Sequence, residues 1–252
     1  MPYTTLATSD TPALVIYLLD VSSSMGQPLG SATRMAVVLQ ALNSALRQMV
    51  YRSTKGSLVA PRYRLAIYAY SDQVYDVLGG VRTIDEVARW GSPDLKPLRT
   101  TETAKAFLQA ERLLLREIPH MLDCPAPLVC HMTDGEYTGA DPESAARDLM
   151  TLSIPDGNVL VENIFIADGL LDSDVTDPYA WPGINAATGL RNPYANRLRA
   201  MSSRLPPSYR SVLNESGYSF EDDALMMLPA ETAELVGLGF QMSAATPTRA
   251  FR

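Results

Sequence analysis

The hydrophobic residues of this chain form uninterrupted runs, separated by segments in which they recur at helical spacing. The first run, Ala-Leu-Val-Ile-Tyr-Leu-Leu at residues 13–19, leads directly into Asp20. A run without alternating polar residues is typical of a parallel strand that helices cover on both faces. Further strands are predicted at residues 64–70, 128–133, 159–167 and 224–228.

Between these runs, apolar residues recur with a period of about 3.6 residues, which predicts helices. The clearest helix follows Gly26 and Gly30 and carries Arg34, Gln40 and Arg47 on its polar side. Its apolar face consists of Met35, Val38, Leu39, Leu42, Leu46 and Met49. Further helices are expected at residues 102–118, from Pro142 onward, at 193–203 and at 231–242.

The alternation of strands and helices predicts an α/β fold with a doubly wound, mostly parallel sheet and helices on both faces. Residues 74–78 are expected to add one antiparallel edge strand. We expect a single domain over residues 1–252. Residues 168–217 are rich in Pro, Gly, Asn and Arg and offer few apolar residues for a core of their own, so they are predicted to be an insertion in that domain. Residues 244–252 are expected to be a flexible tail.

Composition and charge exclude several classes of protein. With 46% hydrophobic and 19% charged residues in 252, the chain can bury a core without disulfides. Its net charge of −7 disfavours sequence-independent nucleic-acid binding. We find no apolar stretch of membrane-spanning length and no signal-peptide pattern at the N-terminus. Since Cys124 and Cys130 are too few for a disulfide framework, a cytoplasmic location is expected.

Oxygen-bearing side chains gather where the predicted strands end. Asp20, Ser22 and Ser24 occupy one short turn after the first strand, Thr101 lies where a loop enters a helix, and Asp134 follows the strand at 128–133. Ligand sites of open α/β sheets lie at the carboxyl ends of the strands. Carboxylate and hydroxyl oxygens suit a hard divalent cation such as Mg²⁺ or Mn²⁺. The alternative for the turn alone is that its Ser and Asp residues cap a helix.

These segments, in this order, resemble the von Willebrand factor A (vWA) domain and its metal-ion-dependent adhesion site. The Asp-x-Ser-x-Ser turn of that family matches Asp20, Ser22 and Ser24, and its distal aspartate matches Asp134 in Thr-Asp-Gly. The threonine ligand is Thr101, with Thr103 beside it, or Thr100 if the match slips by one residue. The resemblance also makes Ser71-Asp72, after the second strand, a structural pair. It implies that Mg²⁺ or Mn²⁺ binds at Asp20, Ser22, Ser24, Thr101 and Asp134.

The resemblance implies a non-catalytic module that binds another protein, whose carboxylate completes the coordination of the metal. The compact layout is similar to that of intracellular bacterial vWA proteins of the tellurium-resistance type. Those proteins accompany protein kinases, PP2C-type phosphatases or MoxR-type ATPases, which suggests a scaffold in a signalling or stress-response complex.

The competing function is a phosphotransferase of the haloacid-dehalogenase type with Asp20 as nucleophile. That chemistry needs a second aspartate two residues later as general acid, and Ser22 stands there. Neither a P-loop nor a nucleophile elbow is present in the sequence.

Three other groups of residues have a candidate chemistry. Cys124, Cys130, His120 and His131 lack zinc-ligand spacing and are expected to be structural. Asp172, Asp174 and Asp177 lack the glycine and glutamate of a calcium loop and are expected to form a solvated acidic loop. Arg191, Arg197, Arg199, Arg204 and Arg210 form either a solvated helix face or a docking surface for an acidic or phosphorylated partner.

Overall fold

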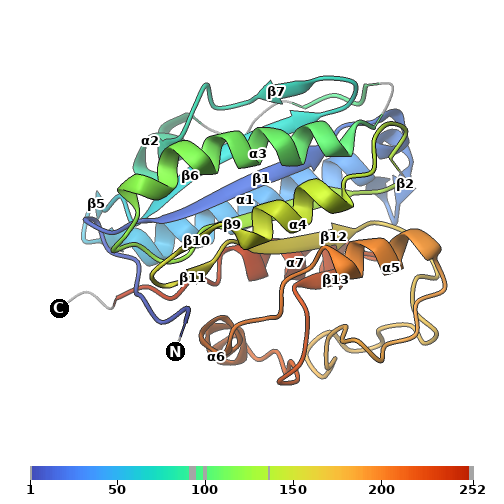
Figure 1. The fold of residues 1–252 in the computed structure, drawn as a ribbon. Helices are drawn as coiled ribbons and strands as arrows, with labels where there is room; N and C mark the ends of the chain where they lie inside the picture. Colours follow the sequence, from blue (N-terminus) through green and yellow to red (C-terminus); the bar gives the residue numbers. More distant parts are fainter. Residues whose placement is uncertain (1, 91–94, 99–100, 136, 250–252) are drawn as a thin grey trace.

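A seven-stranded sheet forms the centre of the molecule in the computed structural model, which describes residues 2–90, 95–98, 101–135 and 137–249 (Figure 1). The strand order is β13-β12-β9-β1-β6-β7, and β8 pairs with β6. The parallel strands are β1 (Ala13–Asp20), β6 (Tyr63–Tyr70), β9 (Leu128–Thr133), β12 (Leu160–Phe165) and β13 (Met227–Pro229). The antiparallel strands are β7 (Val74–Asp76) and the short β8 (Arg82–Thr83).

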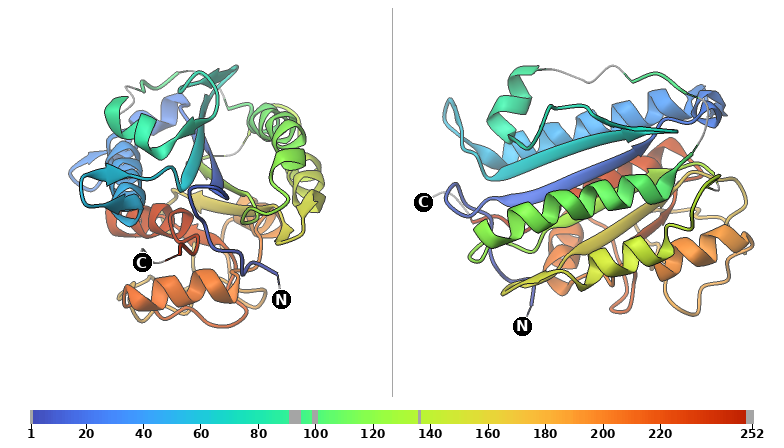
Figure 2. Two further views of the ribbon diagram at one scale, coloured as in Figure 1. Left: turned by 90° about the vertical axis from the view of Figure 1, so that its left-hand side faces the viewer. Right: turned by 45° about the horizontal axis from the view of Figure 1, so that its top comes forward.

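Helices cover both faces of this sheet, as Figure 2 shows most clearly in its left-hand view. One face carries α1 (Arg34–Ser53) and α7 (Ala233–Ser243), which pack on each other, and α2 (Ile84–Trp90) lies beside α1. The other face carries α3 (Thr103–Glu117), α4 (Glu143–Thr151) and α5 (Pro193–Ala200). The predicted fold class is therefore confirmed, with β8 as a second antiparallel pairing on the outer side of β6. No helix in the described ranges is both long enough and apolar enough to span a membrane.

The remaining elements are short and, like α2 and β8, were not predicted. They are the helix α6 (Pro207–Glu215), the 3₁₀ turns η1 (Ser23–Gly26) and η2 (Ile118–His120), and the hairpins β2–β3 (Pro28–Leu29, Ala32–Thr33), β4–β5 (Thr54–Lys55, Leu58–Val59) and β10–β11 (Ser153–Ile154, Gly157–Asn158). Strands of two residues carry too little periodicity to be recognised in a sequence.

The segment 168–217 connects β12 to the last strand, β13, and contains α5 and α6. Its buried residues, among them Trp181, Ile184 and Leu198, belong to the same core cluster as the central strands. Asn163 of β12 anchors α5 to the sheet, because its side-chain amide donates to the Ser202 hydroxyl at 2.9 Å and to the carbonyl oxygen of Met201 at 3.1 Å.

The expectation of a flexible tail is wrong for residues 244–249. Ala244 and Thr246 are buried, and the Arg52 guanidinium donates to the carbonyl oxygens of both. Thr248 forms a parallel bridge with Ala7, which ties the tail to the N-terminal segment. The hydrogen bonds from the charged Arg52 side chain hold this segment in place, and the composition of the segment does not reveal them. Residues 250–252 lie outside the described ranges.

The expectation of buried structural roles is confirmed for His131, Cys124 and Cys130 and is wrong for His120, which is exposed in η2. The His131 ring bonds the Tyr70 hydroxyl at 2.7 Å and the side-chain oxygen of Asn163 at 2.8 Å, and burial lowers its pKa to about 4. Cys124 and Cys130 are buried free thiols. Among the described residues, no three His, Cys, Asp or Glu side chains lie together as the ligands of a zinc site would.

The packing of α7 on β12 gives a prediction at two glycines. A Cβ at Gly239 would lie 2.6 Å from Cδ1 of Ile164, whereas a Cβ at Gly237 of the same helix would meet nothing within 4 Å. We expect Gly239→Ala to lower the free energy of unfolding by about 1–3 kcal/mol through overpacking. Gly237→Ala is expected to raise it by up to about 1 kcal/mol. Urea unfolding of both variants measures these changes in the free energy of unfolding. Equal changes would contradict the close packing of Gly239 against Ile164.

Candidate metal centre

Asp20, the last residue of β1, is fully buried at the carboxyl edge of the sheet. One carboxylate oxygen, Oδ1, accepts the backbone N–H of Ser22 at 2.8 Å, and Oδ2 accepts the Thr133 hydroxyl at 2.7 Å. Burial raises the pKa of Asp20 to about 6, the hydrogen bonds from Thr133 and Ser22 oppose this rise, and the nearby Asp134 adds to it. A carboxylate held in this way favours a bound cation, because a cation restores the stability of its ionised form.

Ser22, Ser24 and Asp134 form a chain of contacting oxygens beside Asp20. The hydroxyls of Ser22 and Ser24 lie 2.9 Å apart, and the Ser24 hydroxyl donates to Oδ1 of Asp134 at 2.6 Å. Ser24 is carried by the turn η1, and Asp134 follows β9, the strand next to β1. Four of the five predicted ligands, Asp20, Ser22, Ser24 and Asp134, are thus brought together by two adjacent strands.

The loop that carries Thr101 crosses the same edge. The N–H of Leu98 donates to the carbonyl oxygen of Val21, and the N–H of Glu102 donates to the carbonyl oxygen of Ser71 at 2.8 Å. Thr101 is buried, and its carbonyl oxygen accepts the N–H of Thr138 at 2.9 Å, in the loop after Asp134. The backbone therefore places Thr101 against the loop after Asp134, and no hydrogen bond among the described residues joins its side chain to the other four predicted ligands. The alternative ligand Thr100 lies outside the described residues.

Ser71 and Asp72, which follow β6, support this loop. The Ser71 hydroxyl donates to the Asp72 carboxylate at 2.8 Å, while the backbone carbonyl of Asp72 accepts the Lys105 ammonium at 2.9 Å. These contacts hold the start of α3 against the end of β6.

One charged member of the site was not predicted. The Arg34 guanidinium forms an ion pair with Oδ2 of Asp134 at 2.9 Å, and the Asp134 side chain is fully buried. Helical periodicity placed Arg34 on the polar, outward side of its helix. The relevant signal was its position, because the first residue of a helix that starts from the carboxyl edge lies beside the loops of that edge.

The arrangement of oxygens suits a six-coordinate cation. With metal–oxygen distances of about 2.1 Å, neighbouring ligands of an octahedral Mg²⁺ lie about 3.0 Å apart. The hydrogen bonds of 2.9 Å between Ser22 and Ser24 and of 2.6 Å between Ser24 and Asp134 already hold these oxygens next to one another, so a cation would replace the hydroxyl protons that now join them. The donors are carboxylates and neutral hydroxyls, which favour Mg²⁺ or Mn²⁺ over softer metals.

The arginines of the insertion each contact an acidic side chain or a backbone carbonyl. Arg191 pairs with Asp172, Arg197 with Asp141 and Arg210 with Asp222, while Arg199 and Arg204 donate to backbone carbonyls. Arg197 also bonds the Tyr137 hydroxyl, which fastens α5 to the loop after Asp134. Asp177 accepts the N–H of Tyr179 rather than converging with Asp172.

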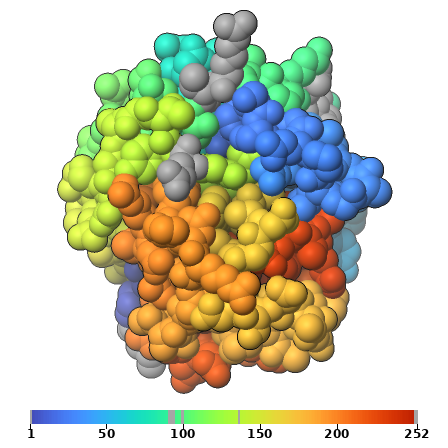
Figure 3. Space-filling view, turned by 90° about the vertical axis from the view of Figure 1, so that its right-hand side faces the viewer, coloured from blue at the N-terminus to red at the C-terminus, as the bar shows by residue number. Residues whose placement is uncertain are grey.

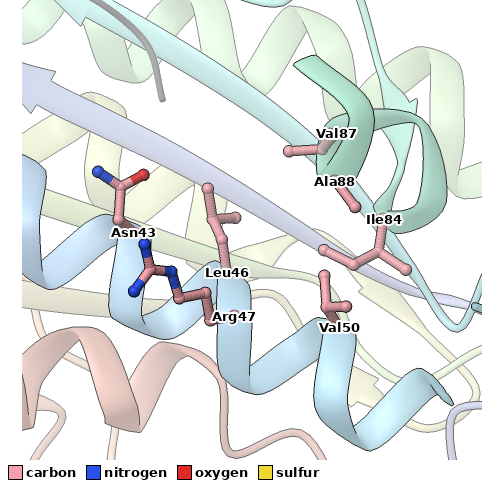
Figure 4. A pocket seen from close by; sticks show the side chains of 7 residues that line it. All are labelled: Asn43, Leu46, Arg47, Val50, Ile84, Val87 and Ala88. Atoms are coloured by element: carbon pink, nitrogen blue, oxygen red, sulfur yellow. The ribbon is translucent and has the colours of Figure 1, made fainter. Parts of the chain in front are cut away.

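Figure 3 shows the carboxyl edge face-on, with the blue β1–α1 segment, the yellow-green segment after β9 and the orange insertion meeting there. A separate hollow lies between α1 and α2, lined mainly by apolar side chains such as Leu46, Val50 and Ile84 (Figure 4). None of the predicted ligands lines it, so it is not part of the metal centre.

Neither a known family model nor a curated protein sequence matches the chain. Solved structures do resemble it. Proximal thread matrix protein 1 from the mussel byssus has a TM-score of 0.51 and 14% identity over 93% of this chain and 47% of its own. The form of that protein with a zinc-occupied MIDAS motif has a TM-score of 0.50, with 14% identity over 93% and 48%. The PilB minor pilin from Streptococcus sanguinis has a TM-score of 0.53 and 10% identity over 94% and 62%.

The chain spans about half the length of the first of these proteins and less than two thirds of the pilin. At these identities the comparison shows a shared fold. The chain therefore has a vWA-like α/β fold, in which a mostly parallel sheet with an antiparallel edge lies between helices on both faces.

Proposed function

We propose that this protein is a non-catalytic binding module that holds Mg²⁺ or Mn²⁺ through Asp20, Ser22, Ser24, Thr101 and Asp134. The observation that carries the proposal is the run of contacting oxygens from Ser22 through Ser24 to Asp134, beside the buried Asp20. Because the hydroxyls are neutral, two carboxylates do not over-neutralise a divalent ion. A carboxylate from a partner protein then completes the coordination of the metal.

The proposed partner is a protein in an intracellular bacterial signalling or stress-response complex: a protein kinase, a PP2C-type phosphatase or a MoxR-type ATPase. The support is the resemblance of the compact layout, the strand at residues 14–19 and the closing helix to intracellular vWA proteins of the tellurium-resistance type. The buried free thiols of Cys124 and Cys130 are compatible with a reducing cytoplasm. Capture of a partner from the lysate of the source cells should require divalent metal and should fail in EDTA.

The enzymatic alternative has no support from the site. Ser22 occupies the position where a phosphotransferase of the haloacid-dehalogenase type needs its acidic residue, and a serine hydroxyl is a poor proton donor at neutral pH. Incubation with a generic phosphatase substrate and Mg²⁺ should give no turnover. Robust turnover that Asp20→Asn abolishes would replace the proposed function with an enzymatic one.

Metal binding is expected to stabilise the fold. At a metal concentration about a hundred times the Kd, binding to the folded state alone adds about 2.7 kcal/mol to the free energy of unfolding. For a chain of this size that corresponds to a rise in Tm of about 5–10 °C. Thermal unfolding with MgCl₂ or MnCl₂, and then with excess EDTA, checks this against NaCl of equal ionic strength. A Tm that does not respond to either metal would contradict the proposal.

A further inference from the structure

Arg34 occupies an electrostatically unfavourable place in its own helix. It is the first residue of α1, whose first turn contains no acidic residue. The positive end of the helix dipole disfavours a cation there, by up to about 1 kcal/mol. A residue that contradicts the local preference in this way points to a role outside the helix.

That role lies at Asp134. The guanidinium contacts Oδ2 of Asp134 at 2.9 Å, while Oδ1 accepts the Ser24 hydroxyl. Only 13% of the Arg34 side chain is exposed, and none of the Asp134 side chain. The carboxylate is therefore shared between a fixed cation on one oxygen and the proposed metal ligands on the other.

We infer that Arg34 is a resident cation of the metal centre, which lowers its affinity for the divalent ion and keeps the loaded site positively charged. The inference rests on the proposed function. A divalent ion and one guanidinium against the carboxylates of Asp20 and Asp134 leave one net positive charge. Without Arg34 the loaded site is neutral and attracts an incoming carboxylate less strongly. Arg34 thus weakens the binding of the metal and strengthens the binding of the acidic partner.

The test compares Arg34→Gln with Arg34→Lys, which keeps the charge, and with Arg47→Gln as a matched control. Arg47 is exposed on the same helix, about 20 Å further along at 1.5 Å per residue, beside the hollow in Figure 4. Arg47→Gln changes the net charge of the protein by the same amount as Arg34→Gln. The charge of Arg47, however, lies farther from the metal centre than the electrostatic screening length. Circular dichroism establishes that each variant is folded.

Isothermal titration with MnCl₂ at an ionic strength of about 0.1 M, where the screening length is about 10 Å, gives the first readout. We expect Arg34→Gln to bind Mn²⁺ on the order of tenfold more tightly than wild type, because a neighbouring unit charge no longer repels the ion. Arg34→Lys and Arg47→Gln are expected to stay within about threefold of wild type. The second readout is acetate, titrated into the Mn²⁺-loaded proteins and followed by water proton relaxation. Arg34→Gln is expected to need several times more acetate to displace metal-bound water.

The outcomes distinguish a failure of the inference about Arg34 from a failure of the proposed function. If wild type binds Mn²⁺ and Arg34→Gln binds it equally or more weakly, or if the acetate response does not change, the inference about Arg34 is wrong while the proposed function stands. If wild type and all variants fail to bind Mn²⁺, the proposed function itself fails. Binding of Mn²⁺ by Arg34→Gln alone would support the role of Arg34 and contradict a metal-dependent wild type.

Discussion

Glu162→Gln is expected to stabilise the protein at neutral pH, by a margin that grows as the pH rises. Glu162 lies on β12, opposite Cys130 of β9, and is fully buried. Apart from the thiol of Cys130, its carboxylate oxygens have no hydrogen-bond partner among the described residues. Burial therefore raises the pKa of Glu162 well above its ordinary value, and contact with the Cys130 thiol offsets only part of this rise.

The direction of the pH effect follows from linkage. The folded protein keeps Glu162 protonated, while the unfolded chain loses this proton above a pH of about 4.3. Wild type therefore has its full stability below that pH and loses about 1.4 kcal/mol per pH unit as the pH rises toward the folded-state pKa. Glutamine has no proton to lose, so the advantage of the variant should grow as the pH rises from 5 toward the folded-state pKa of Glu162.

Urea unfolding of wild type and Glu162→Gln at several pH values measures this difference. Glu215→Gln is the control, since Glu215 is exposed at the end of α6 and its replacement should leave the pH dependence unchanged. If the free energy of unfolding of Glu162→Gln changes with pH in the same way as that of wild type, the Glu162 carboxylate is ionised and solvated in the folded protein.

Asp20→Ala is expected to reduce metal affinity at least about a hundredfold, because changes in outer-shell groups alone cost about 10–100-fold. The fold should persist. The change leaves the Ser22 N–H and the Thr133 hydroxyl without this acceptor, but it also removes a carboxylate whose ionisation burial disfavours. We therefore expect the free energy of unfolding of the metal-free variant to lie within about 1 kcal/mol of that of metal-free wild type.

The matched control for Asp20 is Asp76→Ala. Asp76 is an exposed aspartate on β7, the strand beside β6, and it belongs to none of the loops that carry the predicted ligands. Its variant should retain the rise in Tm with Mn²⁺ that Asp20→Ala loses. If Asp20→Ala unfolds while wild type shows no metal response, the Asp20 turn is a structural cap and not a ligand set.

The long elements of the fold were predictable because their signals are local. The apolar runs that became β1, β6 and β9 need helices on both faces, and α1 repeats its apolar face over many turns. The helix α6 was missed because it lies in a segment rich in Pro and Arg. The buried tail was missed because its order depends on Arg52, which is remote in sequence from Thr246.

The candidate metal centre was predictable in part for a similar reason. Asp20, Ser22 and Ser24 share one turn, and parallel strands bring the end of β9 to the same edge, so the meeting of Ser24 and Asp134 follows from the topology. The ion pair of Arg34 with Asp134 does not follow, since periodicity describes which side of a helix faces the core but not what its first residue contacts. The charge balance of the site became visible only in three dimensions.

The central claim is that Asp20, Ser22, Ser24, Thr101 and Asp134 surround one divalent ion. Anomalous diffraction from a crystal soaked in MnCl₂ tests it directly. We predict a single strong peak between the hydroxyls of Ser22 and Ser24 and the carboxylates of Asp20 and Asp134, and its loss in Asp20→Ala. A peak at another place on the chain, or no peak at saturating Mn²⁺ while these side chains are ordered, would contradict the account.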